Sequence, residues 1–158
     1  MAMRIFLEIE GVDGESKLLE GAVDLLSYSF SMSRPSTAHL GSGGSGGDLT
    51  ASDFMFTHNL DAASNGIRQY MVDGKQDFAC KLTVVKPTKD KVVTLKYDMK
   101  NCMFTSAMVA GGPADEVVVE DVSLAYSGVD FAYTPEEEDG SAGSEMACTI
   151  DLEAGGLA

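Results

Sequence analysis

Apolar side chains alternate with polar ones along most of this chain, and this period of two is typical of β-strands with one buried face. The apolar positions are Ile5, Leu7 and Ile9; Tyr28, Phe30 and Met32; Phe54 and Phe56; Phe78, Cys80, Leu82 and Val84; Val93, Leu95, Tyr97 and Met99; Val118, Val122, Leu124 and Tyr126; Val129, Phe131 and Tyr133; and Met146, Cys148, Ile150 and Leu152. A chain of 158 residues, 44% of them hydrophobic, is long enough to bury one core. We therefore expect a single, mainly β domain over residues 1–158.

Two places depart from the alternation. The segment from Asp61 to Gly74 predicts a helix, because aspartate is a preferred N-cap and glycine a preferred C-terminal stop. Its buried face would consist of Ile67, Tyr70 and Met71. Within the run from Glu116 to Thr134 the apolar parity changes across Gly128. A glycine at such a point predicts a β-bulge that bends one long strand.

Composition excludes several classes of protein. A net charge of -14 argues against nucleic-acid binding, because neutralising phosphates requires clustered Lys and Arg. No stretch approaches the roughly 20 apolar residues of a membrane-spanning helix, and the alternating N-terminus does not have the pattern of a signal peptide. We expect a cytoplasmic protein without membrane insertion. Three widely spaced cysteines, each in a strand-like run, predict buried reduced thiols, so we expect neither a metal site nor another cofactor.

No recognised arrangement of catalytic residues is present. The sequence has no G-x-S-x-G motif, and the only histidines are His39 and His58, which we interpret as surface or turn residues. Gly41, Gly43 and Gly46 match G-x-G-x-x-G, but strand-like sequence follows where a dinucleotide site needs a helix. The sequence therefore does not predict an enzyme.

Charge is distributed unevenly. Six of the eleven basic residues lie between Lys81 and Lys100, in a hairpin whose tip is near Pro87, and everything after Lys100 is acidic or neutral. The two regions could pair within one molecule, or they could attract the next copy as opposite poles. The candidate charges for such stacking are Lys86, Lys89, Lys91, Glu136, Glu137, Glu138 and Asp139.

The strand LLSYSFSMS, residues 25–33, has an unusual polar face. It places Ser27, Ser29, Ser31 and Ser33 on one side and large apolar side chains on the other. Exposed strands usually carry charges or threonines, whereas a row of serines gives a small, uncharged and weakly binding surface. A long glycine-rich loop follows, from Gly41 to Gly47.

Several of these segments, in order, are similar to the Hcp family, the haemolysin-coregulated tube proteins of type VI secretion systems. The resemblance rests on the first strand, the motif GVDGES at Gly11–Ser16, the serine strand and the loop that begins with His39, Leu40 and Gly41. It continues through Asp53–His58, Lys81–Val85 and Val129–Pro135.

The resemblance implies a small closed β-barrel of two packed antiparallel sheets with one short flanking helix, assembled as a hexameric ring. Rings would stack into a tube that is propelled into target cells and can carry small effector proteins. The resemblance places the four serines on the inner wall of the ring. It assigns the long loop, about Arg34 to Leu49, to contacts with a neighbouring subunit or ring: His39, Leu40, Gly41, Gly43, Gly44, Gly46 and Gly47.

Implied partners are further copies of the chain, the sheath, spike and baseplate proteins of the secretion machine, and small effectors. Export would occur without a signal peptide. Two other interpretations of the sequence remain: a tube subunit of a related phage-like contractile injection machine, and a soluble β-barrel module that binds a protein or glycan.

Overall fold

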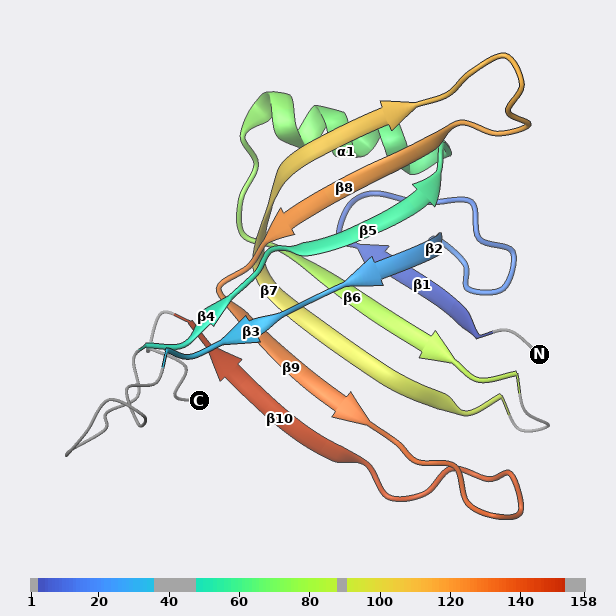
Figure 1. Ribbon diagram of the computed structural model, residues 1–158, viewed down its shortest axis with the longest axis vertical. Helices are drawn as coiled ribbons and strands as arrows, with labels where there is room; N and C mark the ends of the chain where they lie inside the picture. Colours follow the sequence, from blue (N-terminus) through green and yellow to red (C-terminus); the bar gives the residue numbers. More distant parts are fainter. Residues whose placement is uncertain (1–2, 36–47, 88–90, 153–158) are drawn as a thin grey trace.

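The computed structural model describes residues 3–35, 48–87 and 91–152, which form ten strands and one helix (Figure 1). The elements are β1 (Arg4–Ile9), β2 (Val23–Ser29), β3 (Met32–Ser33), β4 (Thr50–Ala51), β5 (Phe54–Asn59), α1 (Ala62–Asp73), β6 (Phe78–Val85), β7 (Val93–Ala110), β8 (Val119–Ala125), β9 (Gly128–Tyr133) and β10 (Met146–Asp151).

The main sheet is antiparallel and closes on itself. Its strand order is β10-β9-β7-β6-β1-β2-β5-β8, and β8 also pairs with β7, so six strands form a closed barrel. The 18-residue β7 makes this possible, because its first half pairs with β6 and β9 while its second half pairs with β8. Strands β3 and β4 form a separate small ladder, which projects from the barrel at the left of Figure 1. The expected β-barrel with one flanking helix is confirmed.

The side chains that point into the barrel are apolar residues at the alternate positions that the sequence predicts. Leu7, Phe54, Leu82 and Leu124 are fully buried, and they come from four different strands. Aromatic rings link the barrel to the helix. Tyr70 of α1 packs on Phe78 with ring centroids 5.0 Å apart, and Phe78 packs on Phe104 with ring centroids 5.1 Å apart. Large buried rings of this kind dominate the stability of a small core.

Helix α1 begins and ends as expected. The Asp61 side chain accepts a hydrogen bond from the backbone N–H of Ala63 at 2.9 Å, and Gly74 ends the helix in the left-handed conformation. Its fully buried residues are Ala63, Ser64 and Ile67, whereas Tyr70 and Met71 are half-buried against the core. Gly66 lies in the middle of the helix, where a Cβ atom would approach a Val12 methyl group to 2.8 Å, so glycine permits close packing there.

The motif at Gly11–Ser16 joins the β1–β2 connection to the helix. Gly11 has a φ of 81°, and a Cβ atom there would overlap the Tyr70 hydroxyl, which donates to the Glu10 carbonyl. A Cβ atom at Gly14 would overlap the Ala22 carbonyl. The Glu15 carboxylate accepts a hydrogen bond from the first backbone N–H of α1. The residues of this motif therefore hold the β1–β2 connection close to Ala22 and to helix α1.

The expectation of one bent strand around Gly128 is wrong. The chain leaves β8 at Ala125 and starts a new strand, β9, at Gly128. The two strands pair with different halves of β7, so the parity changes because the chain moves to another part of the sheet. Gly128 instead lets β10 approach, since a Cβ atom there would lie 3.2 Å from the Ile150 carbonyl.

Some residues at the alternate positions predicted to be buried are exposed in the structure. Met32 is 45% exposed because β3 has left the barrel, and Met146 is 63% exposed on β10, the last strand of the sheet. Cys148, also on β10, is exposed, so the prediction of a buried thiol is wrong there, whereas Cys80 and Cys102 are buried. A strand with a single neighbour extends beyond the layers that would cover its apolar face.

Candidate functional site

The serine strand presents an exposed polar face, as its sequence predicts. Ser27 and Ser29 of β2 are exposed, whereas Tyr28 between them turns inward and stacks on Phe54 at 5.9 Å between centroids. The register of β2 against β5 shifts between Leu25 and Ser27, which is a bulge. Because of this bulge Leu26 is 54% exposed beside the serines, although it follows the buried Leu25.

Ser31 and Ser33 are exposed too, but they lie outside the barrel. Ser31 follows the end of β2, and its backbone N–H donates to the Ser52 hydroxyl at 3.0 Å. Its carbonyl accepts from the Ser52 backbone N–H at 2.8 Å. Ser33 belongs to β3 and pairs with Thr50 of β4. The four serines are therefore divided between the barrel wall and the projecting β3–β4 ladder.

Sequence reasoning missed the residues that extend this face across β5, β8 and β7. Outward side chains beside Ser27 and Ser29 line a shallow hollow of about 500 Å³; they include Met55, Thr57, Asp121, Ser123, Ser106 and Met108. The Ser106 hydroxyl donates to the Ser123 hydroxyl at 2.9 Å, and Thr57 donates to Asp121 at 2.6 Å. We call this surface, formed by these six residues together with Ser27 and Ser29, the hydroxyl face.

The residues of the hydroxyl face on β5 and β8 could have been found from the alternation, because they occupy the positions between the predicted core residues. Those on β7 could not, since its register against β8 shifts between Phe104 and Ser106. Chemically, the face offers hydroxyls and two methionines with one carboxylate, Asp121, already paired to a hydroxyl. Such a surface can make many weak hydrogen bonds but has no strongly basic or nucleophilic group.

The two charged regions meet within one molecule. The Lys86 ammonium lies 3.6 Å from the Glu136 carboxylate, so for this pair the intramolecular alternative is the one observed. Lys91 and the acidic residues 137–139 are exposed. Hydrogen bonds from Ser141 lower the pKa of the Asp139 carboxyl. A role of these charges in stacking stays a prediction.

Lys89 lies outside the described residues, and so do the loop candidates His39, Leu40, Gly41, Gly43, Gly44, Gly46 and Gly47.

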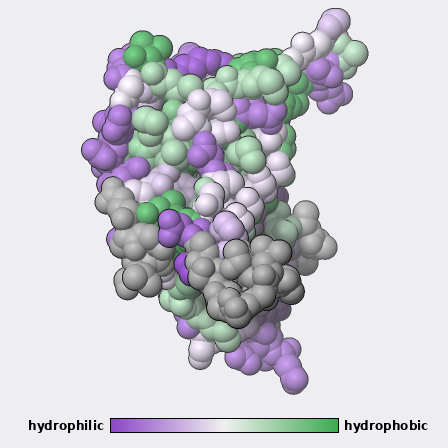
Figure 2. Space-filling view, turned by 60° about the vertical axis from the view of Figure 1, so that its left-hand side comes forward, coloured by the Kyte–Doolittle hydropathy of each residue, from purple (hydrophilic) through white to green (hydrophobic). Residues whose placement is uncertain are grey.

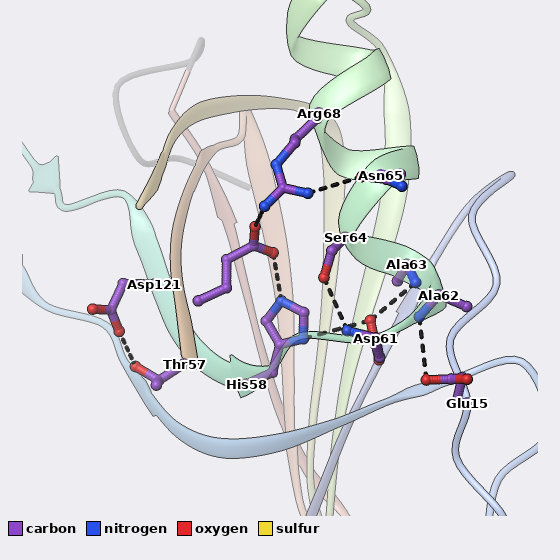
Figure 3. A network of polar contacts seen from close by, with 11 residues as sticks. Glu15, Thr57, His58, Asp61, Ala62, Ala63, Ser64, Asn65, Arg68 and Asp121 are labelled. Carbon is purple, nitrogen blue, oxygen red and sulfur yellow. Dashed lines mark hydrogen bonds and ion pairs between the residues drawn. The ribbon is translucent and has the colours of Figure 1, made fainter. Parts of the chain in front are cut away.

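His58 is not a surface residue. Its side chain is fully buried beneath α1, and its Nε2 atom lies 2.7 Å from Oε1 of Glu120, which is also fully buried (Figure 3). The Arg68 guanidinium of α1, at the outer end of the cluster with a side chain 41% exposed, lies 3.2 Å from the other Glu120 oxygen, and His58 Nδ1 lies 3.7 Å from Asp61. We call these four residues the buried ionic cluster. The interpretation of His58 as exposed is wrong because its parity matches that of Phe54 and Phe56.

The buried ionic cluster has a structural role. It connects β5 and β8 to the first turns of α1, and His58 and Glu120 are fully buried there. Burial raises the pKa of the Asp61 carboxyl, an effect opposed by the nearby His58 and by the Ala63 backbone N–H. Sequence reasoning missed Glu120 because it lies in an acidic stretch that reads as solvent-exposed.

Within residues 3–35, 48–87 and 91–152, no group of three or more His, Cys, Asp or Glu side chains is placed to hold a metal ion. The described helix is neither long nor apolar enough to cross a membrane.

A family model described as "Type VI secretion system effector, Hcp" matches residues 6–133. The chain belongs to the Hcp family. It is 30% identical to the protein Hcp1 of Pseudomonas aeruginosa over 144 residues, which cover 89% of each chain. The Hcp relationship therefore extends over nearly the whole barrel, including the segments on which the resemblance was based.

Solved structures agree with this assignment. The crystal structure of Hcp1 from Salmonella typhimurium is 27% identical, with a TM-score of 0.80 over 99% of each chain. A structure described as that of a type six secretion system protein has a TM-score of 0.91 over 98% of each chain at 22% identity, which supports the Hcp fold. Secretion through a type VI system is thus established at the level of the family.

Proposed function

We propose that this chain is the structural subunit of the inner tube of a type VI secretion system, assembled as hexameric rings that stack into a tube. The observation that supports the proposal most directly is the hydroxyl face, an exposed face of a closed barrel that carries mainly hydroxyls. A surface of this kind suits the wall of a passage, because hydroxyls exchange hydrogen bonds with water at little net cost.

Ser27 and Ser29 lie within the hydroxyl face, and we propose that they contact cargo in the lumen. Each contact would be weak. Retention of a small effector would then depend on the same face repeated around a closed ring, which raises the local concentration of binding groups. Ser31 and Ser33, on the β3–β4 ladder, would contact cargo near the rim, where the long loop leaves the barrel.

The long loop would contact a neighbouring subunit or ring, and the exposed charges near Lys91 and residues 137–139 would contribute to stacking. Sheath, spike and baseplate proteins and small effectors would be the other partners. We propose no catalytic role, because the hydroxyl face has no base beside its serines and His58 is engaged with Glu120. The protein would assemble in the cytoplasm and leave the cell inside the machine.

The first test is the native mass of the protein by light scattering, with negative-stain images of the same fraction. We expect a mass of about six chains and annular particles. A monomer at high concentration would contradict the proposal and favour a binding module.

The second test concerns the lumen. The variant Ser29→Glu should form rings but lose retention of a co-expressed small effector, because it adds a ring of charge to the hydroxyl face. Ser144→Glu, on an exposed loop away from that face, is the matched control and should retain the effector. Loss of the ring itself in Ser29→Glu would show that Ser29 lies at a subunit contact instead.

A further inference from the structure

A basic hollow lies on the outer side of β1. Its floor is Phe6, which is only 5% exposed although its neighbour Leu7 points into the barrel. Leu18, from the β1–β2 connection, is 61% exposed at the edge of the hollow, and the rest of the lining is Arg4, Val85, Lys86, Pro87 and Lys91. The hollow has a volume of about 390 Å³. We call it the basic groove.

The charge of the basic groove is unusual in a chain of net charge -14. Glu136 pairs with Lys86, and Asp24 faces Phe6 in the β1–β2 ladder. Arg4 makes no ion pair with any described residue. The groove therefore combines apolar surface with cationic groups that are available to a partner, and it suits an acidic segment with apolar side chains.

The chain carries such a segment in the connection between β7 and β8, residues 111–118. This connection projects from the barrel and is the highest point of both views (Figures 1 and 2). It presents Asp115 and Glu116 beside Val117 and Val118, which are 53% and 39% exposed. Apolar side chains on a projecting acidic loop are typical of a contact surface.

The two surfaces lie at different places on one molecule. In Figure 1 the β7–β8 connection is at the top, whereas the start of β1 and the end of β6, which border the basic groove, lie at the lower right. A contact between them therefore needs two copies and is heterologous, the type that closes into a ring when its rotation closes and forms a filament when it does not.

We propose that the β7–β8 connection of one subunit docks into the basic groove of the next subunit around the ring. Glu116 would face Arg4 or Lys91, and Val117 would pack against Leu18 over Phe6. Asp115 has a separate role, because its carboxylate accepts the Gly112 backbone N–H at 2.8 Å and fixes the turn. This inference rests on the proposed ring, and it specifies which surfaces close the ring.

The test is charge reversal, read out as the dissociation constant of the ring from sedimentation or light scattering across a concentration series. Arg4→Glu and Glu116→Arg should each raise that constant at least about tenfold, since each replaces an attraction by a repulsion. The double variant Arg4→Glu/Glu116→Arg should recover most of the loss, because the pair is restored with opposite signs. Lys75→Glu, an equal change of charge at an exposed position after α1, is the control and should leave the constant within about twofold.

A second measurement does not depend on charge. In a Cys148→Ser background, Leu18→Cys and Val117→Cys introduced together should allow a short bis-maleimide to link subunits into a ladder of multimers, while either cysteine alone should not. If the wild type forms rings, the charge-reversal variants form them with the same dissociation constant and the double-cysteine variant gives no ladder, the proposed contact is overturned while the tube function stays intact. A wild-type protein that forms no ring would instead contradict the tube function itself.

Discussion

Removing His58 from the buried ionic cluster should destabilise the protein far more than an equivalent change at the surface. The variant His58→Leu replaces the imidazole by an apolar side chain of similar size and leaves Oε1 of the buried Glu120 without its 2.7 Å partner. Leaving a buried hydrogen-bonding oxygen without its partner costs about 1–3 kcal/mol, and more for a charged group, because the oxygen has lost its water as well. With a urea m-value of about 2 kcal/mol/M, the unfolding midpoint should fall by at least about 0.5–1.5 M.

The same pair of strands supplies the control. Thr57 and Asp121 are the adjacent partners in the β5–β8 ladder, bonded at 2.6 Å but on the exposed side. Thr57→Val should therefore cost no more than about 1 kcal/mol. The double variant His58→Leu/Glu120→Met should recover much of the stability, because both polar groups are removed together.

Urea unfolding followed by circular dichroism, at one protein concentration so that association contributes equally, measures these free energies. A loss in His58→Leu no larger than that in Thr57→Val would refute the reasoning. It would mean that Arg68 alone satisfies Glu120, or that water reaches the carboxylate.

Three further outcomes follow from single positions. Gly14→Ala should lower the free energy of unfolding by about 3 kcal/mol in thermal melts, because its Cβ atom would overlap the rigid backbone carbonyl of Ala22. The hydrogen bond from Lys100 lowers the pKa of the Asp130 carboxyl, so this carboxylate stabilises the fold at neutral pH and loses that contribution as the pH falls below the ordinary aspartate value. Lys100→Met should accordingly be less stable than the parent at neutral pH, and the free energies of unfolding of the two proteins, measured by urea titration, should converge at acid pH. A thiol reagent should modify Cys148 rapidly in the native protein and the two other cysteines only after unfolding, as mass spectrometry can count.

The alternation of side chains was sufficient to predict a mainly β domain, because every strand of an antiparallel sheet repeats one rule, whereas the closed barrel was implied by the resemblance to the Hcp family. The alternation reports which side of a strand a residue occupies, but not whether another layer covers that side. Met32 and Cys148 have the parity of core residues and are nevertheless exposed, since β3 and β10 lie beyond the closed barrel. Coverage depends on contacts between distant segments, which a local pattern does not contain.

The hydroxyl face shows the same limit from the other direction. Ser27 and Ser29 were noticed because four serines occur in one strand, but the neighbouring residues on β7 depend on two register shifts and on the pairing of β7 with β8. His58 was misassigned for another reason. Its parity with Phe56 places it inside, but a lone polar residue near a strand end was interpreted as exposed; only the position of Glu120 across the ladder explains why it can be buried.

The β5–β8 ladder explains how a strongly acidic chain keeps an almost uncharged wall. At one step of the ladder Asp121 points outward and bonds a hydroxyl, and at the next Glu120 points inward to His58 and the arginine of α1. Because successive side chains of a strand alternate, Glu120 lies on the side opposite to Asp121, where it is enclosed between the sheet and the helix. The helix therefore does more than cover an apolar patch: it supplies the cation that lets a glutamate be buried. The hydroxyl face thus carries a single carboxylate, Asp121, while other exposed acidic residues lie elsewhere, for example in the connection of residues 111–118.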